Sequence, residues 1–206
     1  MCSMFFVSQK SNQCGLHAIQ NMLKSAAITT GDMHSACETI HENTGDPLQN
    51  HESIGGNWSV AAVLQALQSK GLTVTRAVST KNERAWTGKS MEDLLQDETF
   101  RGFLVHQPTR HHFACMRPEK VGDEQQLYYV DSQSDGPIRI STRLALRRCL
   151  SPAYAWEPYV VCGDELPYVA PDPSPLAVYD NIQESNVDRP KPPESFLREW
   201  RAFTNP

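Results

Sequence analysis

One cysteine, Cys14, stands at the start of a segment whose apolar residues have helical spacing. Leu16, Ile19 and Met22 follow one another at intervals of three residues, as on one face of a helix. The free N–H groups of a first helical turn and the positive end of the helix dipole stabilise a thiolate relative to a thiol. The sequence therefore predicts a cysteine nucleophile at a helix N-terminus.

A thiolate nucleophile needs a base, and a histidine in a later strand-like segment meets this need. His111 opens the segment 111–116, and the next such segment, 127–131, ends at Asp131. An imidazole takes the thiol proton, and a carboxylate that accepts from its other ring nitrogen keeps the ring oriented. We therefore expect Cys14, His111 and Asp131 to form a catalytic triad.

Gln9 lies five residues before Cys14 and supplies a donor for the same chemistry. A tetrahedral intermediate carries a negative oxygen, which N–H groups placed around it stabilise. The side-chain amide of Gln9 and the backbone N–H of Cys14 are the expected donors. Taken alone, Cys14 is better explained as a small buried apolar residue, and Asp131 as a turn former. The joint order Gln, Cys, His and Asp favours the catalytic interpretation.

Length and charge limit the setting of this chemistry. The chain has 206 residues, of which 39% are hydrophobic, and this suffices for one buried core with some additional chain. A net charge of −5 provides no general basic surface for DNA or RNA. No segment approaches the roughly 18 apolar residues of a membrane span. We therefore expect no nucleic-acid partner, no membrane span, and a location in the cytoplasm or the nucleus.

The cysteines favour reduced thiols over a disulfide framework or a metal site. Six cysteines are scattered without framework spacing. Cys14-x-x-His17 and His112-x-x-Cys115 together contain four soft ligands. Residues three apart in a strand point to opposite faces, however, so His112 and Cys115 are poor ligands for one ion. We expect neither zinc nor another cofactor.

Helix signals come early in the sequence and strand signals come late. Ser59 and Ser90 are suited to cap helix N-termini. Helices are expected at 14–23, 59–71 and 90–95, with a short helix or hairpin in 26–50 and a further helix at 142–150. Strands are expected at 72–78, 103–105, 111–116, 127–131, 138–140 and 159–161. Early helices and a later, mostly antiparallel sheet indicate an α+β domain with its site between the two halves.

The composition changes near residue 170. Half of the chain's 14 prolines fall between Pro171 and Pro206. We expect one globular domain at 1–170 and a Pro-rich tail at 171–206. A segment of this tail, 195–203, has aromatic residues on one side of a short helix, which either dock on a protein partner or pack back on the domain.

Several motifs resemble those of one known family. The stretch 9–23, QKSNQCGLHAIQNML, resembles the opening of the Josephin domain, a papain-like cysteine protease family that acts on ubiquitin conjugates. Further matches follow in the family's order at Trp58-Ser59-Val60, His111-His112-Phe113, Tyr129-Val130-Asp131-Ser132 and 159–167. The resemblance covers roughly residues 1 to 170. It implies a papain-like fold, with a helical N-terminal half packed on a mostly antiparallel sheet.

The resemblance also implies roles for individual residues. Gln9 matches the oxyanion glutamine and Cys14 matches the nucleophile. Asp131 matches the third catalytic position, where the family uses Asn or Asp. His111 is chosen as the base because His112 takes the aromatic place in the family's His-aromatic-Phe triplet.

Ubiquitin or its conjugates are the implied partners. The segment 27–53 lies where family members carry a helical hairpin that helps to receive ubiquitin, and the family's apolar ubiquitin patch falls near Val60. Trp58 is a candidate wall for the groove that takes the ubiquitin C-terminus, although packing in the core explains it equally well. His112 is a further candidate substrate-binding residue.

The implied activity is hydrolysis of the bond after the C-terminal glycine of ubiquitin through a thioester. Two alternatives stay open at this point. The first is another papain-like peptidase that cleaves double-glycine leader peptides. The second is a non-catalytic module that binds ubiquitin.

Overall fold

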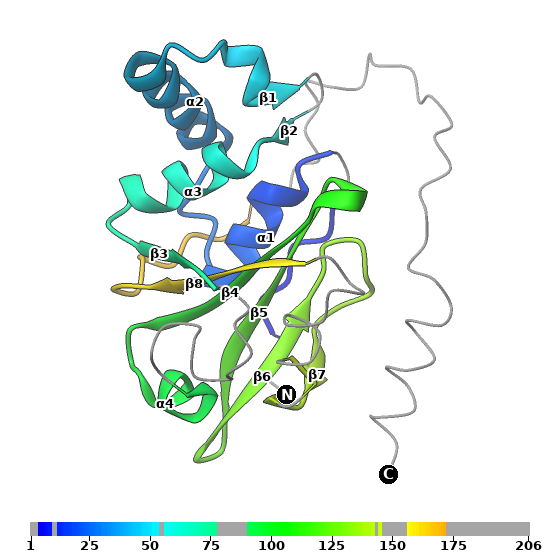
Figure 1. Cartoon of the computed structure of the whole chain (residues 1–206). Helices are drawn as coiled ribbons and strands as arrows, with labels where there is room; N and C mark the ends of the chain where they lie inside the picture. The colour runs from blue at the N-terminus through cyan, green and yellow to red at the C-terminus, as the bar shows by residue number, and fades with distance from the viewer. Residues whose placement is uncertain are drawn as a thin grey trace. The chain divides into compact units, whose positions relative to one another are not determined.

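The computed structural model describes residues 4–9, 12–53, 56–77, 90–142, 144–145 and 156–171 (Figure 1). Its helices are α1 (Cys14–Leu23), α2 (Thr30–Thr44), α3 (Val60–Ser69) and α4 (Met91–Gln96), with 3₁₀ turns η1 (Leu48–Asn50) and η3 (Pro108–Arg110). A two-stranded sheet contains β1 (Glu52–Ser53) and β2 (Asn57–Trp58). No helix of this part of the chain has the length and apolar character needed to cross a membrane.

A six-stranded antiparallel sheet forms the second half of the domain. Its strands are β3 (Thr73–Arg76), β4 (Phe100–Gln107), β5 (His112–Val121), β6 (Glu124–Val130), β7 (Ile138–Ile140) and β8 (Glu157–Cys162). Their order in the sheet is β3-β8-β4-β5-β6-β7. Early helices and a late antiparallel sheet confirm the predicted α+β class.

Local sequence signals explain where the helices begin. Ser59 and Ser90 cap α3 and α4, as predicted, by accepting hydrogen bonds from backbone N–H groups of the first turn. Thr29 and Asp32 form a reciprocal capping box at the start of α2. The segment 26–50, expected as a short helix or hairpin, thus contains a helix of 15 residues.

Two sequence expectations fall partly or wholly outside the described residues. Most of the helix expected at 142–150 belongs to this group, as do residues 172–206 of the expected tail.

Among the described strands, one boundary matters for the site. His111, expected as a strand residue, precedes β5, which begins at His112.

Close packing of α1 depends on a glycine in its first turn. A Cβ atom at Gly15 would stand 2.9 Å from Cγ2 of Val63 in α3 and 3.4 Å from Cδ2 of Phe113 in β5. Only glycine therefore lets the helix approach both elements so closely. Because Gly15 follows Cys14 directly, this contact places the cysteine beside the beginning of β5.

A continuous apolar core joins the helices to the sheet. Its members come from α1, α3 and the inner face of the sheet, and the most buried include Ile19, Met22, Val63, Leu67, Leu104, Cys115 and Val130. Burial of one large aliphatic side chain stabilises a fold by about 1.5–3 kcal/mol. The core therefore holds α1 firmly against β5, and each of these elements carries a candidate site residue, Cys14 and His112, at its first position.

Candidate active site

Cys14 is the first residue of α1, as the sequence predicts, and its side chain is largely buried. Gln13, the residue before the helix, makes no side-chain hydrogen bond to the first turn. The first-turn N–H groups thus stay available to stabilise a negative charge at the sulfur. Two other described cysteines are unsuited to this role, because burial raises the pKa of Cys37 to about 11 and that of Cys115 to about 12.

The imidazole that faces Cys14 belongs to His112. This side chain is 3% exposed, places Nε2 2.8 Å from Oδ1 of Asp131, and lies close enough to the Cys14 side chain for the sulfur to raise the pKa of the ring. His111 is exposed, and its backbone carbonyl rather than its ring lies near the thiol, with 3.9 Å between that oxygen and Cys14 Sγ. The sequence-based placing of the His111 imidazole between Cys14 and Asp131 is therefore wrong.

The strand register explains why His112 takes this place. Cys115 pairs with Val130 in the β5–β6 ladder, so the next step of the register sets Ala114 opposite Asp131. Opposite residues share a face of the sheet, and the face alternates along each strand. His112 lies two residues before Ala114 and hence on the same face as Asp131.

His111 has a different role, in the turn before β5. Its φ of 48° lies in the left-handed region, and its N–H donates to the carbonyl of Pro108 over 3.3 Å. The residue therefore ends the 3₁₀ turn η3 and lets the strand begin one position later than the sequence suggests.

Three donors hold the carboxylate of Asp131. His112 Nε2 and the backbone N of Gln133 donate to Oδ1 over 2.8 and 2.9 Å, and the Tyr129 hydroxyl donates to Oδ2 over 3.1 Å. Burial alone raises the pKa of Asp131, but these hydrogen bonds and the charge of His112 bring it below its usual value. The group is thus an ionised carboxylate at neutral pH.

Tyr129 is a site residue that the sequence reasoning missed. It lies two positions before Asp131, so both side chains project from the same face near the end of the strand. The two-residue spacing within a predicted strand was the sequence signal that could have identified Tyr129. Trp156 stacks on the Tyr129 ring with centroids 5.9 Å apart, which fixes the ring that orients Asp131.

The environment of His112 favours its charged form. Burial alone lowers the pKa of this imidazole, but its polar interactions with Asp131 and Cys14, together with their negative charges, raise it to about 9. Because Nε2 is engaged by Asp131, Nδ1 is the ring nitrogen left for the sulfur. The arrangement suits a thiolate and imidazolium pair oriented by a carboxylate.

The raised pKa of His112 predicts a pH dependence of stability. A histidine in an unfolded chain has a pKa of about 6.5, whereas here it is about 9. The folded state binds this proton more tightly, so the stabilisation is fully present below about pH 6.5 and disappears as the pH rises through about 9. Urea denaturation measures the unfolding free energies of wild type and His112→Gln between about pH 7 and 10. We expect the unfolding free energy to fall further in wild type, and the two falls to differ by at most about 3 kcal/mol. Equal falls in the two proteins would contradict the raised pKa of His112 in the folded state.

Gln9 joins the same cluster through Ser132, the residue after Asp131. The Gln9 backbone N donates to the Ser132 carbonyl over 2.7 Å, and the Ser132 hydroxyl donates to Gln9 Oε1 over 3.0 Å. Of the residues predicted to be catalytic, the structure thus brings Gln9, Cys14 and Asp131 into one cluster, with His112 in place of His111.

Two of the predicted substrate-binding residues, Trp58 and Val60, differ in how far they are buried. Trp58 is 5% exposed and packs edge-to-face on His34, with ring centroids 5.0 Å apart. It offers little surface to a substrate, because it belongs to the core. Val60, the first residue of α3, is only partly buried and packs against the core with part of its side chain accessible.

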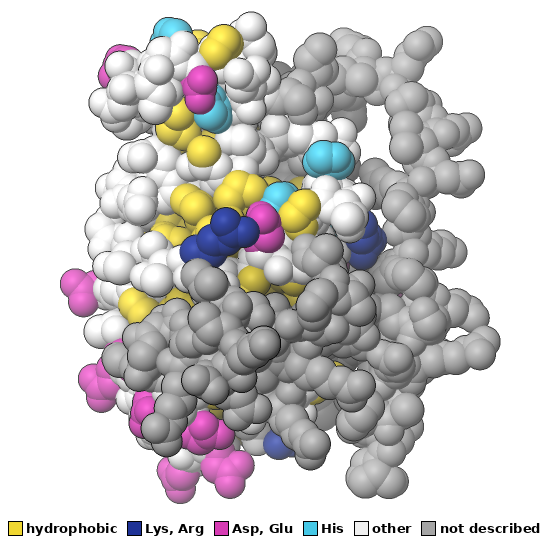
Figure 2. Space-filling view, in the orientation of Figure 1, with side chains coloured by type: hydrophobic (Ala, Val, Ile, Leu, Met, Phe, Trp, Pro, Cys, Tyr) yellow, Lys and Arg dark blue, Asp and Glu magenta, His cyan; other side chains and the backbone are white. Residues whose placement is uncertain are grey.

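A second imidazole and carboxylate pair lies on the adjacent strands β4 and β8. His106 Nδ1 is 2.9 Å from Glu157 Oε2, and Arg76 Nη2 is 2.9 Å from Glu157 Oε1. Figure 2 shows basic, acidic and histidine side chains beside apolar ones on one face of the molecule. Within the described part of the chain, no hydrogen bond joins His106 to a thiol, so this pair lacks the arrangement seen at His112.

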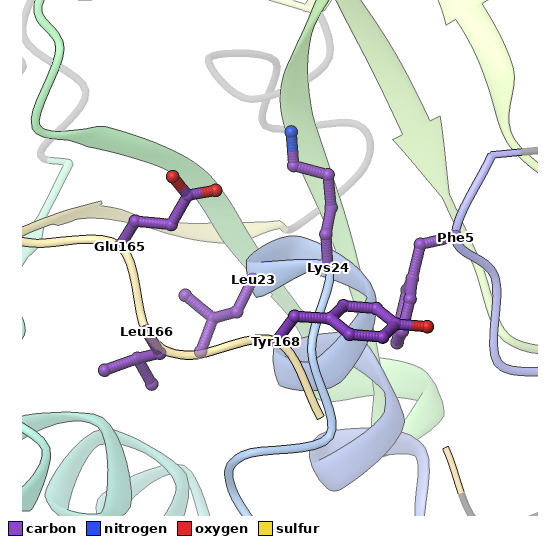
Figure 3. A pocket seen from close by; sticks show the side chains of 6 residues that line it. All are labelled: Phe5, Leu23, Lys24, Glu165, Leu166 and Tyr168. Atoms are coloured by element: carbon purple, nitrogen blue, oxygen red, sulfur yellow. The ribbon is translucent and has the colours of Figure 1, made fainter. Parts of the chain in front are cut away.

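A pocket of about 520 Å³ lies at the opposite end of α1 from Cys14 (Figure 3). Its lining residues are Phe5, Leu23, Lys24, Glu165, Leu166 and Tyr168. The candidate catalytic side chains are not among them. In the described ranges, no group of three or more His, Cys, Asp or Glu side chains is placed to hold a metal ion.

Comparison with known proteins identifies the family. The family model described as Josephin matches residues 9–157, which is well over half of the chain and includes the whole Cys14, His112 and Asp131 cluster. Among curated proteins, no match is found. The extent of the family match, together with the α+β fold, shows that the chain belongs to the Josephin family and has its papain-like fold.

Proposed function

We propose that this protein is a cysteine-type deubiquitinase, which hydrolyses isopeptide or peptide bonds after the C-terminal glycine of ubiquitin. Membership of the Josephin family supports the substrate class. The observation that carries the proposal is the arrangement of Cys14, His112 and Asp131. The sulfur lies at a helix N-terminus and close enough to a buried imidazole to raise the pKa of that ring, and a carboxylate 2.8 Å from Nε2 orients the ring.

Acylation begins with attack of the Cys14 thiolate on the glycine carbonyl carbon. The carbon–sulfur bond forms, and the carbonyl oxygen becomes an oxyanion. The side-chain N–H of Gln9 and the backbone N–H of Cys14 stabilise that oxyanion. The tetrahedral intermediate then breaks its carbon–nitrogen bond, and the departing amine takes the proton from His112 Nδ1. The product of this step is a thioester between Cys14 and ubiquitin.

Deacylation reverses these roles. The now neutral His112 takes a proton from water, and the water oxygen attacks the thioester carbonyl carbon. The same two N–H groups stabilise the second oxyanion. Collapse breaks the carbon–sulfur bond, releases the ubiquitin carboxylic acid, which loses its proton to solvent, and restores the thiolate and imidazolium pair. Asp131 keeps the imidazole oriented in both steps.

Cleavage of a ubiquitin–fluorophore conjugate tests the proposal. We expect steady release of the fluorophore by the full chain, and no cleavage of a double-glycine leader peptide. Cleavage of the leader peptide alone would assign the protein to the other class of papain-like peptidases. Ubiquitin binding without any cleavage would show a non-catalytic module instead.

Replacement of Gln9 by alanine tests the proposed oxyanion donor. Loss of one such donor commonly costs about 3 kcal/mol in the transition state, so kcat should fall roughly 100-fold with little change in KM. Steady-state kinetics on the ubiquitin–fluorophore conjugate measure both constants. Gln9→Glu is the matched control for side-chain size, because it keeps the shape but lacks the N–H donor, and it should lose activity as well. A kcat for Gln9→Ala within twofold of wild type would exclude this role.

A further inference from the structure

We propose that Ser132 is a positioning residue, which fixes the orientation of the Gln9 amide for the oxyanion. This inference rests on the proposed function. Ser132 is 1% exposed and bonds to Gln9 at two points. Its carbonyl accepts from the Gln9 backbone N over 2.7 Å, and its hydroxyl donates to Gln9 Oε1 over 3.0 Å.

The hydroxyl contact determines which end of the amide stays available. With Oε1 of Gln9 engaged by Ser132, the Nε2 group is the end left to donate. Among the described residues, none accepts a hydrogen bond from this Nε2. A donor that is already oriented stabilises a developing oxyanion without reorganisation during the reaction. Without the hydroxyl, rotation of the amide would also present its oxygen, which repels an oxyanion.

The backbone that carries Gln9 is held independently of the Ser132 hydroxyl. We call residues 4–9 the N-terminal arm. The buried Asn21 side chain accepts from Val7 N over 2.7 Å and donates to Val7 O over 3.0 Å. The buried Arg117 guanidinium donates to Phe5 O over 2.7 Å. Removal of the hydroxyl should therefore leave the arm in place and release only the side chain of Gln9.

The segment 131–134, which contains Ser132, also positions the carboxylate of the triad. Ser132 directly follows Asp131, whose Oδ1 accepts from Gln133 N over 2.9 Å. The Ser134 hydroxyl donates to the Asp131 carbonyl over 2.7 Å. One short segment thus sets both the group that orients the imidazole and the group that orients the oxyanion donor.

A double-mutant cycle between Ser132→Ala and Gln9→Ala tests the inference. In the wild-type background, we expect Ser132→Ala to lower kcat on the ubiquitin–fluorophore conjugate about 10-fold, with KM little changed. In the Gln9→Ala background, the same substitution should change kcat less than about twofold, because the amide it orients is absent. An equal loss in both backgrounds would overturn the inference.

Alkylation of Cys14 by iodoacetamide separates positioning of Gln9 from damage to the triad. Alkylation needs the thiolate but no oxyanion donor, so Ser132→Ala should react at the wild-type rate. A slower rate would show that Ser132 acts through Asp131 and His112, against the inference. Ser132→Thr keeps the hydroxyl and should retain kcat within a few fold of wild type. A 10-fold loss of kcat in this variant would also count against the inference. If the wild-type chain cleaves no ubiquitin substrate, the proposed function fails. That result differs from the variant results above, which test only the role of Ser132.

Discussion

We expect replacement of Cys14 by alanine to abolish hydrolysis of a ubiquitin–fluorophore conjugate, because alanine has no atom that can form the thioester. The methyl group leaves α1 and its packing intact, since the Cys14 side chain is small and lies at the first position of the helix. Fluorophore release should therefore fall below detection, while ubiquitin binding measured by calorimetry persists.

A second cysteine provides the matched control for this experiment. Cys37 is buried in α2, and burial raises the pKa of its thiol to about 11. Cys37→Ala removes a thiol of the same size and should keep kcat close to that of wild type. Persistent turnover by Cys14→Ala, or its loss in a folded Cys37→Ala, would place the nucleophile elsewhere.

Replacement of His112 by alanine should lower kcat by roughly 10²- to 10⁴-fold, the usual contribution of a general acid and base. Its imidazole bonds to Asp131, and the neighbouring Cys14 side chain raises the pKa of the ring as well. Steady-state kinetics at neutral pH measure the loss, and iodoacetamide alkylation should slow in parallel because the imidazolium no longer stabilises the thiolate.

The neighbouring histidine separates the two assignments of the base. His111→Asn should keep kcat within a few fold of wild type, because His111 is exposed and its hydrogen bond with the sulfur is through the backbone carbonyl, which asparagine retains. Asparagine tolerates the left-handed φ of 48° found at this position, so the turn should survive. A large loss in His111→Asn with an active His112→Ala would restore the assignment made from the sequence.

Local signals made much of the fold predictable. The apolar spacing after Cys14 gives α1, and the capping residues Ser59 and Ser90 give the starts of α3 and α4. Each of these signals acts within one or two turns of chain, so it can be identified without knowledge of the tertiary structure. The late strands likewise follow from composition, and together they give the α+β class.

The choice between His111 and His112 depended on information that is not local. It requires the left-handed turn at His111 and the pairing of β5 with β6, which determines the face that Asp131 shares. The contributions of Tyr129 and Ser132 depend likewise on side-chain contacts across the strand end. Trp58 could by its residue type form a groove wall or pack in the core, and its burial places it in the core.

A ubiquitin probe with a C-terminal electrophile tests the central claim most directly. The full chain is incubated with the probe, and intact mass followed by peptide mapping locates the adduct. We predict a single covalent adduct on Cys14, formed much more slowly in His112→Ala and absent in Cys14→Ala. A probe that binds the folded wild-type chain without forming an adduct, or that labels a different cysteine, would contradict the assignment of Cys14 and His112 as the reacting pair.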